Sequence, residues 1–286
     1  MSTVVKLGPH WPFFAGVKFL FIFGDSYSSV DYYLEQDCPP DAIQPLGVAY
    51  PGYTWSEENK PNWVGYLISD YYPAPRYIPG RDEKDQDPAY MSSPLLVYNY
   101  ARGGDTIIGV KQQTRSWFLS KAGEKPKWCP WSANTSLFVT WIGINDCAYN
   151  GDHSQSMKDL LVLHGELYEA GARNFLFVDV PPMDRSPALP LDYFSKRENC
   201  YDMWNAALRK AVETFASSHE DVTVLLYSSH ATFTKILDNP EEYGFNAGDV
   251  RRREGSVWAD HLHPTSKVHR IVAQDVAGFL SAVGVN

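Results

Sequence analysis

The sequence predicts an α/β protein, a three-layer α/β/α sandwich around a central parallel sheet of five strands. Five short runs of apolar, β-branched and aromatic residues are almost continuously hydrophobic, as strands buried on both faces are. Segments with apolar residues at i, i+3 and i+4 lie between and after these runs, which is the spacing of amphipathic helices. Strand and helix patterns that alternate in this way indicate a parallel sheet covered by helices.

The five expected strands are the runs that stand out for hydrophobicity, at residues 17–23, 95–100, 137–142, 174–180 and 222–227. Three helices are expected from their apolar stripes, at residues 156–172, 203–215 and 268–280. Gly171 is positioned to end the first of these helices as a C-cap. Thr265 or Ser266, after Pro264, offers an N-cap for the last one.

Composition and length limit the class of protein. The chain has 286 residues, of which 44% are hydrophobic and 21% charged, as in soluble globular proteins. We expect one domain over residues 1–286 rather than two small ones. No apolar run approaches the roughly 18 residues of a membrane span. The net charge of −9 argues against a nucleic-acid partner, and the oligomeric state stays open.

Two stretches interrupt the alternation of strands and helices. Residues 36–62 and 73–94 are rich in proline and turn residues, and the second also carries a run of charges. Long loops in a compact domain are usually either functional or mobile. We expect both to be loop insertions, and the second to be solvated.

Ligands of open α/β sheets bind at the carboxyl ends of the strands, so the strand exits are where chemistry is expected. Four exits carry polar motifs, "GDS" at 24–26, "NYARGGDT" at 99–106, "GIND" at 143–146 and "WADHLHPT" at 258–265. Together they supply a serine, a Gly-Gly backbone, an amide side chain and an Asp with a His nearby. These are the parts of an acyl-transfer site.

A serine nucleophile needs a base within hydrogen-bond reach, and that base needs a third group to orient it. Asp260 and His263 are three residues apart and can meet locally, which would leave the second ring nitrogen of His263 to accept the proton of Ser26. His261 is the rival base. As the immediate neighbour of Asp260, its ring should point away from the ring of His263.

The negative oxygen of a tetrahedral intermediate needs hydrogen-bond donors. We expect the backbone N–H of Ser26, the backbone N–H of Gly104 and the side-chain amide of Asn145 to provide an oxyanion hole. Each motif taken alone is more often an ordinary turn or helix start. All four in this order at strand exits are harder to obtain by accident.

The four blocks resemble those of the SGNH (GDSL-type) esterase and acylhydrolase superfamily over nearly the whole chain. The resemblance implies a flavodoxin-like fold, and it makes Ser26, Gly104, Asn145 and His263 the four family residues, with Asp260 completing a DxxH pair. Phrases such as "QPLGVAYPGYTW" and "VTWIGINDC" are similar to those of fungal acetylesterases of carbohydrate esterase family 16.

This chain departs from the family pattern at a few positions. Asp105 stands where relatives often have Ala, and Arg102 precedes the Gly pair, so the two are either a structural ion pair or a substrate contact that favours an acidic sugar. Tyr27 replaces the fourth letter of the GDSL signature and is expected to pack. Trp258, Trp141 and Trp63 are candidate stacking surfaces for a sugar ring, although such residues are more often part of a core.

The leading hypothesis is a serine carboxylesterase that removes acetyl or another short acyl group, from xylo-oligosaccharides or other sugars. A lipase or phospholipase acting on longer chains is the first alternative, and an inactive carbohydrate-binding protein is the second. No HExxH, P-loop or GxGxxG motif is present, so we expect neither a metal nor a cofactor.

The cysteines and the first residues give evidence on whether the protein is extracellular or cytoplasmic. The even number formed by Cys38, Cys129, Cys147 and Cys200 would permit two disulfides, and Asn134 begins a glycosylation triplet. The first residues lack the apolar segment of a signal peptide. We expect an extracellular protein whose signal has been replaced by a starting Met, with a cytoplasmic protein as the alternative.

Overall fold

The computed structural model describes residues 1–33, 38–149, 153–195 and 198–285. Residues 36 and 37 of the first expected loop lie outside this part of the chain. The strands are β1 (Thr3–Lys6), β2 (Phe19–Gly24), β3 (Leu96–Asn99), β4 (Ser136–Trp141), β5 (Asn174–Val178) and β6 (Thr223–Tyr227). They form one sheet in the order β1-β6-β5-β4-β2-β3.

The five expected strands correspond to β2 through β6, and all five run parallel. Their order places β2 between β3 and β4, so the direction of winding reverses there. This is the flavodoxin-like doubly wound arrangement, in which the ligand crevice opens at the carboxyl ends of the strands beside the reversal.

The expectation of a five-stranded sheet is wrong by one strand. β1 pairs antiparallel with β6 at the edge of the sheet. It has four residues, none of them buried, and therefore lacks the continuous hydrophobic run by which the other strands were recognised. The α/β class is unaffected, because β1 only extends one edge.

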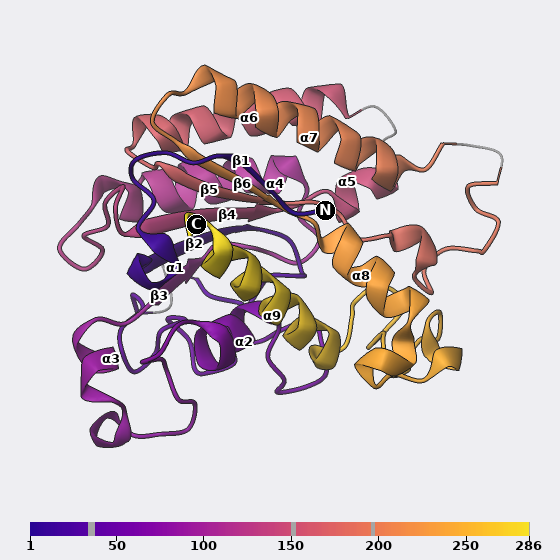
Figure 1. Cartoon of the computed structure of the whole chain (residues 1–286), viewed down its shortest axis with the longest axis horizontal. Coiled ribbons are helices and arrows are strands. Elements are labelled where there is room, and N and C mark those ends of the chain that lie inside the picture. The colour runs from indigo at the N-terminus through magenta and orange to yellow at the C-terminus, as the bar shows by residue number, and fades with distance from the viewer. Residues whose placement is uncertain (34–37, 150–152, 196–197, 286) are drawn as a thin grey trace.

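Helices cover both faces of the sheet. α6 (Ser154–Glu169) and α7 (Cys200–Ser218) lie over one face, while α2 (Trp63–Tyr66) and α9 (Ser266–Ala282) lie over the other (Figure 1). The remaining α-helices are α1 (Phe13–Gly16), α3 (Pro88–Ser92), α4 (Ile107–Gln112), α5 (Ile144–Tyr149) and α8 (Ser229–Asp238). The three layers expected from the sequence are therefore present.

Of the two helix caps predicted from the sequence, the C-cap of α6 forms as expected and the N-cap of α9 differs. At the end of α6, Gly171 has a φ of 103°, its N–H donates to Tyr168 O, and the next N–H donates to Leu167 O, as in a Schellman motif. Thr265 is the N-cap residue of α9, but its side chain makes no capping bond. The backbone N–H of Ser266 instead donates to a carboxylate oxygen of Glu57 at 2.6 Å.

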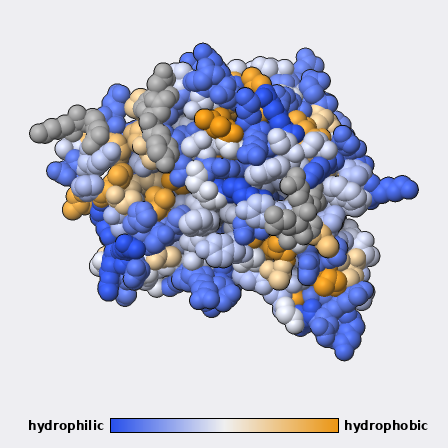
Figure 2. Space-filling view, turned by 180° about the vertical axis from the view of Figure 1, so that it is seen from behind, coloured by the Kyte–Doolittle hydropathy of each residue, from blue (hydrophilic) through white to orange (hydrophobic). Residues whose placement is uncertain are grey.

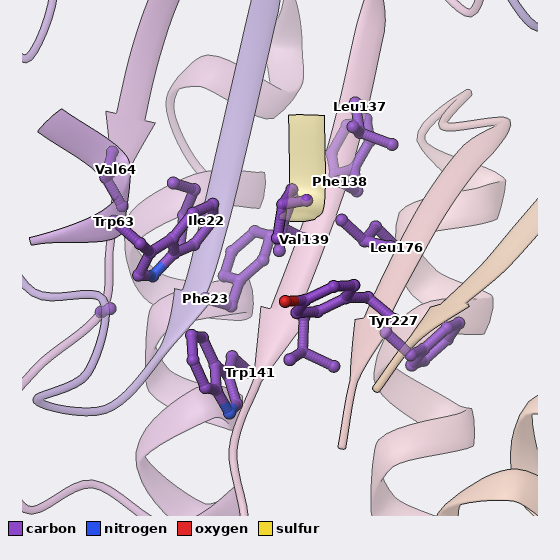
Figure 3. Packing of buried hydrophobic residues seen from close by; sticks show 14 of the residues in the cluster. Ile22, Phe23, Trp63, Val64, Leu137, Phe138, Val139, Trp141, Leu176 and Tyr227 are labelled. Atoms are coloured by element: carbon purple, nitrogen blue, oxygen red, sulfur yellow. The ribbon is translucent and has the colours of Figure 1, made fainter. Parts of the chain in front are cut away.

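The core consists of side chains from both faces of the central strands (Figure 3). All six residues of β4 and all five residues of β5 and of β6 are buried. Aromatic rings from neighbouring strands stack within it, as between Phe21 and Phe138, whose ring centroids are 4.8 Å apart. This packing holds the strand ends, and thus the loops that follow them, in fixed positions.

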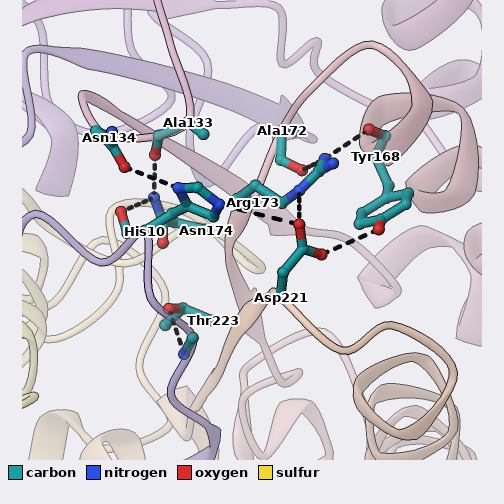
Figure 4. A network of polar contacts seen from close by, with 10 residues as sticks. His10, Ala133, Asn134, Tyr168, Ala172, Arg173, Asn174, Asp221 and Thr223 are labelled. Atoms are coloured by element: carbon teal, nitrogen blue, oxygen red, sulfur yellow. Dashed lines mark hydrogen bonds and ion pairs between the residues drawn. The ribbon is translucent and has the colours of Figure 1, made fainter.

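A network of hydrogen bonds lies at the amino edge of the sheet, where the parallel strands begin (Figure 4). Arg173 Nε donates to Asp221 at 2.7 Å, and the Tyr168 hydroxyl donates to the same carboxylate. At the start of β5, the Asn174 amide donates to three backbone carbonyls. These hydrogen bonds pair donors at the strand starts with backbone carbonyls and a carboxylate, and the chemistry-bearing residues lie at the opposite edge.

The surface carries separate apolar groups divided by polar residues on the face shown in Figure 2. Within the described ranges, no helix combines the length and the apolar character needed to span a membrane.

Candidate active site

Ser26 lies in a tight turn just after β2. The carbonyl of Asp25 accepts hydrogen bonds from the backbone N–H groups of Ser28 and Ser29, both at 3.1 Å, and its carboxylate accepts one from Tyr27 N. These bonds fold the chain back on itself directly behind the serine. Ser26 itself is buried, with only 5% of its surface exposed.

Ser26, His263 and Asp260 form a continuous chain of hydrogen bonds. His263 Nε2 is 2.9 Å from Ser26 Oγ, and His263 Nδ1 is 2.7 Å from Asp260 Oδ2. The second carboxylate oxygen of Asp260 accepts the backbone N–H groups of Leu262 and His263. Partial burial acts to raise the pKa of Asp260, but these backbone and ring hydrogen bonds outweigh it and hold the pKa below its usual range.

The rival histidine lies elsewhere. The ring of His261 is 3.9 Å from Asp260 at its nearest approach, and its side chain is 58% exposed. The side chain of His263 is 9% exposed and lies between Asp260 and Ser26. The structure therefore places His263, and not His261, within reach of the serine proton.

The expected oxyanion donors lie at the exits of three neighbouring strands, β2, β3 and β4. Gly104 has a φ of 80°, and a Cβ added to it would meet nothing within 4 Å, so its backbone faces open space. Asn145 opens α5, and its side-chain amide donates to Asp105 O at 2.8 Å. That bond uses one of the two N–H groups of the amide and orients the other.

Two buried carboxylates, Asp25 and Asp146, lie next to the nucleophile and to Asn145 in the chain. Burial raises the pKa of Asp25 to about 7, and the nearby charges of Asp146 and Asp105 act in the same direction. Asp146 accepts the first backbone N–H of α4, from Ile107, at 3.1 Å. Burial likewise raises the pKa of Asp146, to about 6.

Arg102 and Asp105 both make hydrogen bonds to other groups of the protein. The guanidinium of Arg102 stacks on Tyr33 at 3.8 Å and donates to the carbonyl oxygens of Ala101 and Tyr32. Asp105 accepts a hydrogen bond from Gln113 Nε2 at 2.7 Å. These contacts favour the structural alternative for Arg102, and its contact with substrate stays a prediction.

The expectation that Trp258, Trp141 and Trp63 stack on a sugar is wrong. Each is at most 1% exposed. The indole N–H of Trp258 donates to Val250 O, and that of Trp63 donates to Ser28 Oγ in the nucleophile turn. They belong to the core beneath the site. The prediction failed because residue type alone does not reveal which ring faces solvent.

Three functional neighbours were missed from the sequence. Trp55 stacks on the ring of His263, with centroids 5.1 Å apart and planes 30° apart, and is 41% exposed. The hydroxyl of the buried Tyr27 donates to Leu262 O at 2.8 Å. The amide of Gln113 pairs with both backbone groups of Gly24. Trp55 lay in the phrase "QPLGVAYPGYTW", and Tyr27 was expected to pack, as its 1% exposure confirms, but neither contact was foreseen.

Cys38, Cys129, Cys147 and Cys200 all lie within the described ranges, and none of them forms a disulfide in the structure. Cys147 Sγ approaches Cys200 O at 3.5 Å. Cys38 is exposed and Cys129 is buried.

Comparisons with known proteins identify the family of this chain. The model of the GDSL-like lipase/acylhydrolase family matches residues 20–276. An acetylesterase of Thermothelomyces thermophilus is 31% identical over 91% of this chain and 87% of its own. A thermolabile hemolysin of Vibrio parahaemolyticus is 25% identical over 82% of this chain and 60% of its own.

A solved structure shares the fold. The psychrotrophic esterase EstA of Pseudoalteromonas sp. superposes with a TM-score of 0.50 at 13% identity, over 91% of this chain and 95% of that one. With a family match over most of its length and a relative above 30% identity, the chain belongs to the GDSL-like lipase/acylhydrolase family and is a carboxylic ester hydrolase.

Proposed function

We propose that the protein removes acetyl groups from sugars through an acyl-enzyme on Ser26. The observation that carries this proposal is the hydrogen-bonded chain from Asp260 through His263 to Ser26, with distances of 2.7 and 2.9 Å. It joins a nucleophile to a base and the base to an orienting carboxylate.

In the first half-reaction, Ser26 Oγ bonds to the carbonyl carbon while its proton passes to His263 Nε2. The carbonyl oxygen becomes negative and is stabilised by the N–H groups of Ser26, Gly104 and Asn145. The bond to the alcohol oxygen then breaks, and His263 returns the proton to that oxygen. Asp260 stabilises the charged ring throughout.

In the second half-reaction, water attacks the acyl carbon. His263 accepts a proton from the water and delivers it to Ser26 Oγ as the bond between Oγ and the acyl carbon breaks. The free acid leaves, and the serine hydroxyl is restored.

Acetyl is the acyl group that the comparisons favour, since the relative at 31% identity is an acetylesterase. A series of ethyl esters with acetyl, butyryl and octanoyl groups tests the acyl preference. We expect kcat/KM to be highest for the acetate. A preference for octanoate would contradict the proposal and indicate a lipase.

Mass spectrometry of the enzyme quenched during turnover of an acetate ester tests the intermediate. We expect an added acetyl group on Ser26 in the wild type and none in the Ser26→Ala variant. Acetate release by the variant at a wild-type rate would overturn the role of Ser26.

A further inference from the structure

An exposed aromatic pair stands next to the base of the site. Trp55 covers the ring of His263 and remains 41% exposed. Tyr53 is 66% exposed and meets Trp55 edge-on, with centroids 6.3 Å apart. Two large aromatic residues on a single exposed loop beside a buried triad are not explained by core packing.

Hydrogen bonds join the loop that carries Trp55 and Tyr53 to the segments next to Ser26 and next to His263. The backbone N–H of Tyr53 donates to Val30 O at 3.1 Å, in the segment that follows the nucleophile turn. Thr54 Oγ1 donates to Lys60 O at 2.8 Å, which closes the loop on itself. Glu57 accepts the first N–H of α9, just beyond His263. The backbone that carries the two rings is therefore fixed before substrate arrives.

Gly103 explains how the ring of Trp55 reaches this position. A Cβ added to Gly103 would lie 2.4 Å from Cζ2 of Trp55, closer than real Cβ atoms approach other heavy atoms. The first glycine of the pair thus makes room for Trp55, whereas Gly104 faces open space. Trp55 consequently lies between the base and the expected oxyanion side of the site.

The chemistry of ester hydrolysis decides which part of the substrate meets this pair. His263 protonates the departing alcohol oxygen, so the alcohol part of the ester must lie on the His263 side of Ser26. Trp55 covers that side. The exposed part of its ring is thus on the side from which the alcohol part departs.

Tyr53 contributes to a hollow in the same loop that has the character of a site for a polar ring, while Trp55 and the triad are not among the described residues that line it. Its volume is about 390 Å³, and sites for small ligands commonly measure about 300–1,000 Å³. Polar and aromatic residues line it, namely Gly52, Tyr53, Thr54, Ser56, Glu58 and Asn59. Aromatic faces pack against the C–H faces of a sugar, while side-chain oxygens and amides can bind its hydroxyls.

We propose that Trp55 and Tyr53 form the subsite for the alcohol part of the ester, and that this part is a pyranose ring of an acetylated oligosaccharide. The proposal rests on the esterase function proposed above and adds where the sugar binds.

The test compares kcat/KM for an acetylated xylo-oligosaccharide with kcat/KM for ethyl acetate, whose alcohol has no ring. For Trp55→Ala we expect the ratio to fall about 10-fold, and for Tyr53→Ala about 3-fold, as expected for a lost aromatic contact. Trp55→Phe keeps an aromatic face and should recover part of the ratio. Trp128→Ala is the matched control, because Trp128 is 39% exposed and precedes β4 at the amino edge of the sheet.

Binding is measured separately from catalysis by calorimetry in the Ser26→Ala background. Adding Trp55→Ala should weaken binding of the same oligosaccharide about 10-fold, and adding Trp128→Ala should not change it. An unchanged ratio in both aromatic variants, together with unchanged binding on adding Trp55→Ala, would overturn the subsite, as would a wild type that cleaves ethyl acetate but not the oligosaccharide. A wild type inactive on every acetate ester would instead overturn the proposed function, and the subsite with it.

Discussion

The hydroxyl of Tyr27 donates a hydrogen bond to the carbonyl oxygen of Leu262 at 2.8 Å. Tyr27 follows the nucleophile Ser26 in the chain, and Leu262 precedes His263. This bond therefore connects the turn that carries the serine to the loop that carries its base. A side chain that breaks the GDSL signature thus holds the two catalytic segments together.

Replacing Tyr27 by Phe removes this hydrogen bond and leaves the rings in place. We expect the free energy of unfolding to fall by about 1–3 kcal/mol, because the Leu262 carbonyl loses its buried partner. We also expect kcat for an acetate ester to fall, since His263 is held less firmly. Urea unfolding and initial rates measure the two effects.

Tyr72→Phe is the matched control for that variant. The Tyr72 hydroxyl donates to Ala15 O and Val17 O, which precede β2 at the far edge of the sheet. Tyr72→Phe should lower the free energy of unfolding to a similar extent without lowering kcat. Equal losses of kcat in both variants would show that Tyr27 acts only through stability.

His263→Ala and Asp260→Asn should differ in severity. Removing the base abolishes proton transfer, and we expect a loss of about 10⁶-fold in kcat, against about 10⁴-fold for Asp260→Asn, which leaves a poorly oriented base. His261→Ala should retain most of the rate, because its ring does not reach Ser26. Initial rates on ethyl acetate decide this, and a dead His261→Ala variant beside an active His263→Ala variant would refute the assignment.

Asn145→Ala tests the oxyanion hole. The variant loses a donor that acts when negative charge forms, so kcat should fall about 10²–10³-fold with little change in KM. Thermal unfolding must be measured alongside, because Asn145 also donates to Asp105 O. A lower melting temperature with unchanged kcat would make Asn145 a purely structural residue.

The strands were predictable because a strand buried on both faces has an almost continuous run of hydrophobic residues. Residues 137–142 are nearly all apolar, and β4 occupies Ser136–Trp141. β1 has no such run, since an exposed edge strand of four residues depends on pairing with β6 and not on its own hydrophobicity.

The triad was predictable because Ser26 follows a strand, and Asp260 and His263 lie within one loop. The contact between Trp55 and His263 joins two loops far apart in the chain, and no periodicity marks either residue. The same limit explains why Trp141 and Trp258 were wrongly taken as sugar contacts. Exposure is a property of the folded chain and not of the residue type.

Asp25 makes the pH dependence of stability testable. Burial raises its pKa to about 7 in the folded protein, from 3.8 as a free side chain. The neutral form is favoured by folding, so its contribution to stability is complete below about pH 4 and is lost as the pH rises through 7. In Asp25→Asn the side chain stays neutral at every pH, and its oxygen can still accept the N–H of Tyr27.

The free energy of unfolding of Asp25→Asn, minus that of the wild type, should therefore be smallest near pH 4 and grow by about 1.4 kcal/mol per pH unit. It should level off above pH 7, where Asp25 is charged in both states of the wild type. Urea unfolding at pH 4, 5, 6, 7 and 8 measures the difference. Asp192→Asn, the same change at an exposed position, is measured at the same pH values as the control. A difference for Asp25→Asn that stays constant from pH 4 to 8 would mean that Asp25 is ionised in the fold, with a partner for its charge behind Ser26.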